Sequence, residues 1–165
     1  MLASLVFTAS NTYAGPTIIG SGLKLMLSGN GSIAQSSLIF FGGADANSVR
    51  LDASARPDKT LILAGGQTLA GIGGVAGNLV VSANATLSPA GTNTSLGLTT
   101  GASPTGTIFA TNDVSLLGTS RIKLNGSGTN DSVHAGSHIT YGGTLNLVFE
   151  AVKTRLASMP QRAAA

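Results

Sequence analysis

The chain contains no cysteine and no tryptophan, and only five phenylalanines and two tyrosines among its 165 residues. The absence of cysteine excludes disulfide bonds and thiolate metal sites, and it is compatible with a reducing or an oxidising compartment. The scarcity of aromatic side chains argues against a globule built on a few large anchors. A core must therefore be assembled from Leu, Ile, Val and Ala in narrow layers.

Charged residues are also scarce, at 9% of the chain. Between Thr60 and Asn112 there is no Asp, Glu, Lys, Arg or His, so this stretch offers no group for acid–base chemistry at neutral pH. Its apolar residues come in short bursts such as Leu61-Ile62-Leu63, whereas a membrane-spanning helix needs about 20 consecutive apolar residues. We therefore expect no membrane span here, and short strands joined by tight turns instead.

The formal net charge of +3 is unevenly distributed. Lys153, Arg155 and Arg162 against Glu150 place +2 in the last residues, which leaves +1 for residues 1–149. That body has no basic patch, and its aromatic residues do not alternate with cations. We therefore expect no nucleic-acid partner.

Glycine, by contrast, is abundant, with 23 residues. Together with Asn, Ser and Thr, it separates short segments in which apolar residues alternate with others, as in Leu23–Leu27. The period of two predicts which side chains point into a core and which point to solvent. The residues predicted to be buried are Leu23, Leu25, Leu79, Val81, Ile122, Leu124, Leu145 and Leu147, and those predicted to be exposed are Lys24, Arg121 and Lys123.

Pairs of such strands recur at intervals of about 20 residues, the length of one coil of a β-solenoid. Six to eight coils would fill the chain at about that spacing. We expect parallel strands and less than about 10% helix outside residues 150–165, far below the globular average. An antiparallel sandwich is the second choice, because aromatics and Asn-Gly or Asp-Gly hairpin turns are few.

The two ends differ from this pattern. Met1–Ala9 is apolar but lacks a positively charged leader, which disfavours a signal peptide and suggests that the sequence starts within a longer chain. Phe149–Met159 is rich in helix formers and is followed by Pro160. We therefore divide the chain into a β-solenoid at residues 1–149 and a cap helix or disordered tail at residues 150–165.

One segment carries a family resemblance. Asn11-Thr12-Tyr13-Ala14-Gly15-Pro16-Thr17-Ile18-Ile19-Gly20-Ser21-Gly22-Leu23-Lys24-Leu25 resembles the autotransporter-associated β-strand repeat, whose pattern is Asn-Thr-Tyr-x-Gly-x-Thr, an aliphatic pair, Gly and Leu-x-Leu. Residues 60–148 also look like the stretch that follows such repeats in large bacterial surface proteins, so the resemblance covers roughly Thr8 to Val148.

The resemblance implies an all-β fold, a right-handed parallel β-helix within an exported passenger domain. It also implies an extracellular or outer-membrane location, no enzymatic activity, and neighbouring repeats of a longer chain as partners. Surface carbohydrate or protein ligands are the further partners that such a scaffold would bind. The chain departs from the family in having no recognisable signal sequence and no outer-membrane barrel.

Three patterns have catalytic or binding potential, and each also has a purely structural interpretation. Gly71–Ala76 satisfies Gly-x-Gly-x-x-Ala, but no helical pattern follows and no carboxylate occurs between Asp58 and Asp113, so we interpret it as solenoid corners. His134 and His138 would be about 13 Å apart on one strand, too far to share an ion. For Asp131 beside His134, hydrogen bonding in a turn is favoured over a ligand or base role.

The remaining pattern is a cluster of charges, formed by Asp45, Arg50, Asp52, Arg56, Asp58 and Lys59. It is read as a solvated turn between coils, although β-helical polysaccharide lyases do use acidic calcium ligands with a basic proton acceptor. Thr92, Thr94, Thr105 and Thr107 are similar to threonine ladders that bind ice or carbohydrate, but they are too few to form an array. No catalytic residue, cofactor or metal ligand is predicted.

The sequence therefore predicts a non-catalytic structural or adhesive scaffold segment of a bacterial surface or secreted protein. A β-helical carbohydrate-active enzyme is the alternative. A small binding module of the sandwich type is a third possibility.

Overall fold

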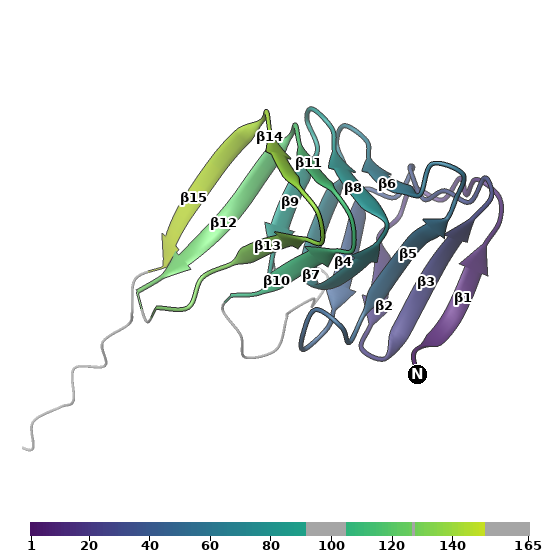
Figure 1. The fold of residues 1–165 in the computed structure, drawn as a ribbon, viewed down its shortest axis with the longest axis horizontal. Helices are drawn as coiled ribbons and strands as arrows, with labels where there is room; N and C mark the ends of the chain where they lie inside the picture. The colour runs from purple at the N-terminus through teal and green to yellow at the C-terminus, as the bar shows by residue number, and fades with distance from the viewer. Residues whose placement is uncertain (92–104, 127, 151–165) are drawn as a thin grey trace, which may run out of the picture.

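The computed structural model describes residues 1–91, 105–126 and 128–150, and every regular element in them is a β-strand (Figure 1). The strands are β1 (Ala3–Phe7), β2 (Thr17–Gly20), β3 (Leu23–Ser28), β4 (Leu38–Gly42), β5 (Arg50–Ala55), β6 (Thr60–Leu63), β7 (Thr68–Ala76), β8 (Asn78–Val81), β9 (Thr86–Pro89), β10 (Thr107–Ala110), β11 (Val114–Leu116), β12 (Thr119–Asn125), β13 (Ser132–Ala135), β14 (Ile139–Tyr141) and β15 (Thr144–Glu150). The described part of the chain accordingly holds no helix with the length and apolarity that crossing a bilayer would need. The predicted cap helix or tail lies outside the described residues from position 151 onward.

The strands form three parallel sheets that the chain visits in turn. The first sheet contains β1, β3, β5, the end of β7, β10 and β13. The second contains β6, β8, β11 and β14, and the third contains β2, β4, the start of β7, β9, β12 and β15. Because all pairings between these strands are parallel, the parallel β-helix is confirmed and the antiparallel sandwich is wrong.

The described strands form six coils that stack one upon another, from β1 at one end to β15 at the other (Figure 1). Equivalent positions on the first sheet are Leu5, Leu25, Leu51, Val75, Ala110 and Ala135, so successive coils are 20, 26, 24, 35 and 25 residues long. The predicted six to eight coils are therefore confirmed at six described coils, and the predicted interval of about 20 residues holds for the first coil, while the others are longer. The corners between strands lengthen some coils much more than others.

The glycine-rich stretch of β7 turns one of these corners without interrupting the strand. Residues 68–72 pair with β4 in the third sheet, and residues 73–75 pair with β10 in the first. Gly71 has a φ of +97°, a conformation that favours glycine because it has no Cβ. The interpretation of Gly71–Ala76 as a solenoid corner is confirmed.

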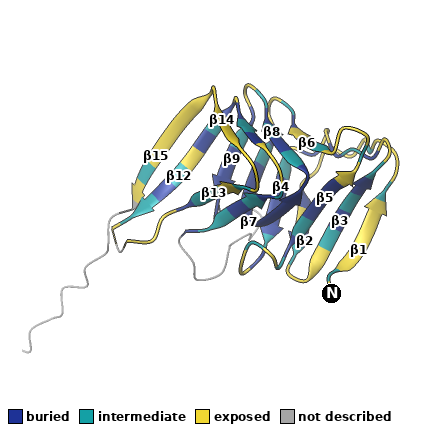
Figure 2. Ribbon diagram, viewed as in Figure 1, coloured by how far each residue is buried: buried dark blue, intermediate teal, exposed yellow. Residues whose placement is uncertain are grey.

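Inward side chains stack in columns from coil to coil and form the core, which Figure 2 shows as dark blue along the central strands. Leu25, Leu79 and Val81 are buried as predicted. On the first sheet, a β-carbon on Gly73 would overlap the ring of Phe41, so the missing side chain makes room for one of the few large aromatics. Apart from Phe40 and Phe41, the buried hydrophobic residues of the described chain are Leu, Ile, Val and Ala, as the composition indicates.

Three of the leucines predicted to be buried are exposed instead. Leu145 and Leu147 point inward, since they pair with Ser120 and Ile122, but they lie on β15, the last described strand, and are 51% and 56% exposed. Leu23, 45% exposed, borders an apolar opening of about 330 Å³ beside β1. Ile122 and Leu124 are partly buried. The sequence thus predicts the direction of these side chains correctly. An inward side chain is buried only where a further coil covers it on each side.

The three cations predicted to be exposed differ in how far solvent reaches them. Arg121 is exposed, as expected, and Lys24 is partly buried. Lys123 is only 6% exposed, and its Nζ donates a hydrogen bond of 3.0 Å to the carbonyl oxygen of Ala90, which gives the buried ammonium an acceptor. The prediction for Lys123 is therefore wrong, and the buried ammonium joins two coils.

Candidate functional site

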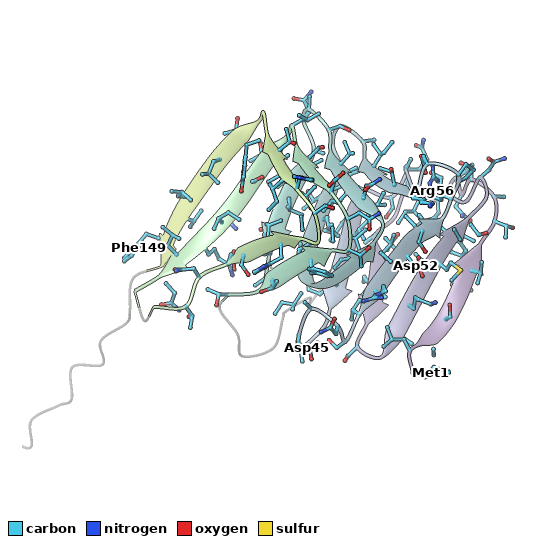
Figure 3. The ribbon with its side chains drawn as sticks, in the orientation of Figure 1. Met1, Asp45, Asp52, Arg56 and Phe149 are labelled. Atoms are coloured by element: carbon cyan, nitrogen blue, oxygen red, sulfur yellow. The ribbon has the colours of Figure 1, made fainter. Side chains whose placement is uncertain are left out.

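The charge cluster predicted from residues 45–59 does not converge in space. Figure 3 shows Asp45 in the loop after β4, Asp52 on β5 and Arg56 near the turn that follows it. The Arg56 Nε lies 3.0 Å from Asp58 Oδ1 and its Nη2 lies 3.1 Å from Asp58 Oδ2. This hydrogen-bonded pair lowers the pKa of Asp58. Arg56 also donates to the carbonyl oxygen of Gly31, so it fastens a turn to the preceding coil.

Asp52 lies in a separate cluster on the first sheet. The Ser54 hydroxyl and backbone N–H donate to its Oδ1 at 2.6 and 3.0 Å, and Lys24 Nζ lies 3.6 Å from its Oδ2. Burial raises the pKa of Asp52, but the Ser54 hydrogen bonds and the Lys24 charge together outweigh this and hold the pKa below its ordinary value. The carboxylate is therefore stabilised in its ionised form.

We expect Asp52→Asn to lower the free energy of unfolding at pH 7. Because the folded pKa is depressed, ionised Asp52 stabilises the protein fully above its unfolded pKa of about 3.9, and this contribution disappears as the pH falls through the folded pKa. The difference between the two proteins should therefore shrink below about pH 4. Urea unfolding at a series of pH values measures it, and a constant difference down to about pH 2.5 would contradict the assignment.

Each of the five aspartates accepts a hydrogen bond from a backbone N–H group. The donors are Asn47 to Asp45, Ser54 to Asp52, Thr60 to Asp58, His138 to Asp113, and both Gly106 and Lys123 to Asp131. In the first three cases the donor lies two residues after the aspartate, the local turn that this side chain favours. The carboxylates thus shape turns and join coils.

The histidines lie apart. His134 is on β13 beside Phe109 of β10, whereas His138 follows the corner at Gly136 and places its Nδ1 3.4 Å from Asp113 Oδ1. The expectation that both histidines share a strand is wrong, because the chain turns from the first sheet to the second between them. Asp131 bonds to backbone groups of other coils. No set of three potential metal ligands occurs among the residues that the structure describes.

The third sheet carries a threonine column that the sequence analysis missed. Thr68 pairs with Thr86, Thr86 with Thr119, and Thr119 with Thr144. Their neighbours Leu69 and Leu87 are buried, so strand alternation directs the threonines outward. The intervals of 18, 33 and 25 residues conceal the column in one dimension. Of the candidates named from sequence, Thr92 and Thr94 lie outside the described residues, and Thr107 bonds to Ser132.

Beside this column lies a groove of about 300 Å³ on the outer surface of the third sheet. Hydroxyl groups and one guanidinium line it, together with small apolar side chains. The lining residues include Ser37, Leu38, Thr68, Ala70, Ser88 and Arg121. The groove therefore combines hydrogen-bonding groups with an exposed positive charge, which is the chemistry of a binding surface for a polar anionic ligand.

Comparison with known proteins gives no match: no family model, no curated protein and no solved structure matches this chain. The likeness of residues 11–25 to the autotransporter-associated repeat therefore stays a prediction.

Proposed function

We propose that this chain is a non-catalytic structural or adhesive scaffold segment of a bacterial surface or secreted protein of the autotransporter type. The observation that carries the proposal is the role of the aspartates. All five aspartate carboxylates accept backbone N–H groups in turns or between coils, which fits a chain in which these charges stabilise the fold.

The stacking of the coils supports the same proposal. Parallel strands lie about 4.8 Å apart, so six coils build a stiff body with hydroxyl-bearing side chains on its outer surface. Such a body holds other parts of a longer protein at a distance, and it presents the same kind of side chain repeatedly along its axis. Repeated weak contacts then give adhesion through multivalency.

The alternative is a β-helical polysaccharide lyase, and the observation that favours it is the contact between Lys24 and Asp52 on the first sheet. A lyase needs a base that takes a proton from the sugar ring. In this cluster Asp52 is already engaged by two groups of Ser54 and by Lys24. The scaffold role is therefore the better supported of the two.

We expect the purified protein to show no turnover of polygalacturonate, pectin or simple esters, with or without calcium. Release of unsaturated sugar products, followed by ultraviolet absorbance, and ester hydrolysis are the measurements. Lyase activity that Asp52→Ala or Arg56→Ala abolishes, while Asp45→Ala leaves it unchanged, would overturn the scaffold proposal. Far-ultraviolet circular dichroism of each variant controls for loss of the fold.

A further inference from the structure

We propose that the groove on the outer surface of the third sheet binds a carboxylate-bearing polysaccharide, with Arg121 pairing with a sugar carboxylate. The inference rests on the proposed scaffold function in its adhesive form, and it adds a site and a ligand class. Three observations support the proposal: the groove, the guanidinium within the groove, and the threonine column beside it.

Arg121 supplies the charge recognition. Its side chain is exposed on β12 and forms no ion pair with the residues that the structure describes, unlike Lys24 and Arg56. A guanidinium presents a planar fork of N–H donors that matches the two oxygens of a carboxylate. Lys123, two residues further along β12, is committed to the carbonyl oxygen of Ala90, so Arg121 acts as the free cation of this strand.

The hydroxyl groups supply contacts for the rest of a sugar chain. Ser37, Thr68 and Ser88 line the groove with Arg121. From Thr68 the threonine column continues through Thr86 and Thr119 on adjacent strands, at the strand spacing of about 4.8 Å. A linear polymer lying across the strands would therefore meet a hydroxyl donor and acceptor on each successive coil.

Charge complementarity points to an anion. The strands of the third sheet contain no acidic residue before Glu150 at the end of β15, so no fixed negative charge on them repels a carboxylate near Arg121. Among the residues that the structure describes, the groove lining has no aromatic ring on which a nucleic-acid base would stack. A hydroxyl-rich chain that carries a carboxylate matches the single guanidinium and the hydroxyl groups of this surface.

The test uses the full chain and short oligogalacturonates, titrated calorimetrically at low salt, with the methyl-esterified oligomers as a matched neutral probe. We expect the unesterified oligomers to bind, and the esterified ones to bind at least about tenfold more weakly, because the ester has no charge to pair with Arg121. Binding should weaken as salt is added.

Variants then locate the site. Arg121→Gln should weaken binding about tenfold or more, Arg121→Lys should restore part of the loss, and Thr68→Val should weaken binding by a few fold. Lys59→Gln is the matched control, since it removes an exposed cation from the turn before β6 and should leave binding unchanged. A sulfated oligosaccharide of equal length forms a further arm, and preference for it over the carboxylate would overturn the assignment of ligand class.

Equal binding of Arg121→Gln and the unaltered protein, equal binding of the esterified probe, or no binding at all would each overturn the proposal. None of these results bears on the structural scaffold function, which lyase activity that depends on Asp52 or Arg56 would overturn. The product assay on the same oligomers separates the two outcomes.

Discussion

Replacing Asp131 with alanine is expected to lower the free energy of unfolding by about 2–5 kcal/mol, since one buried and one partly buried backbone N–H group lose their acceptor. Asp131 is 6% exposed and accepts hydrogen bonds of 2.9 Å from Gly106 N–H and from Lys123 N–H. Without the carboxylate the Lys123 N–H stays buried and loses this acceptor, and the partly buried Gly106 N–H loses its acceptor as well. Urea unfolding measures the loss, provided that the slope of the unfolding free energy against urea concentration is the same for the variant and the unaltered protein.

The matched control is Asp45→Ala. Asp45 also accepts a backbone N–H, from Asn47 at 2.7 Å, but its loop is exposed and water can replace the lost acceptor. We expect a loss below about 1 kcal/mol for this variant. Asp131→Asn should fall between the two, because the amide keeps one acceptor oxygen. Equal losses for the Asp45 and Asp131 variants would show that burial of the hydrogen bonds is not what makes Asp131 important.

Asp131 and Lys123 act together at one place in the fold. Lys123 Nζ donates to Ala90, just before residues 92–104, and Asp131 accepts from Gly106, just after them. Asp131 also accepts from the Lys123 backbone, so the two side chains join both ends of this stretch to β12. The buried pair therefore holds Ala90 and Gly106 against the same segment of the chain, residues 123–131.

The alternation of Leu25 with Lys24, and of Leu79 and Val81 with Val80, was enough to predict the direction of most side chains, whereas the parallel coils were predicted from the recurrence of strand pairs and the scarcity of aromatics and hairpin turns. This works because strand geometry is local and has a fixed period of two. Burial was harder to predict. Leu147 points inward and is exposed, and Lys123 points outward and is buried, because neighbouring coils and corners decide how much of a side chain is covered.

The candidate binding surface could not be predicted from local patterns at all. Thr68, Thr86 and Thr119 become neighbours only when the unequal coil lengths are known, and those lengths depend on corner segments without a periodic signal. The same applies to Asp131, whose partners Gly106 and Lys123 lie 25 and 8 residues away. The alternation of side chains can be read within each strand, whereas the register between coils depends on the lengths of all the segments that connect them.

Gly71→Ala is expected to cost about 3–5 kcal/mol or to prevent folding, because it combines backbone strain with overlap between coils. Gly71 has a φ of +97°, and a β-carbon there would press into the backbone of Phe41 in the preceding coil. Coils about 4.8 Å apart cannot separate at one corner without breaking the parallel hydrogen bonds on either side of it.

Gly22→Ala separates these two causes. Gly22 has a φ of +80°, but a β-carbon there would meet nothing within 4 Å, so only the strain of about 1 kcal/mol remains. Thermal and urea unfolding of both variants measure the difference, with limited proteolysis as the readout if Gly71→Ala does not fold. If the two substitutions cost the same, stacking of the coil backbones does not restrict this corner. A loss at Gly71 that clearly exceeds the loss at Gly22 assigns the excess to contact between coils, and thereby to the close stacking on which the scaffold depends.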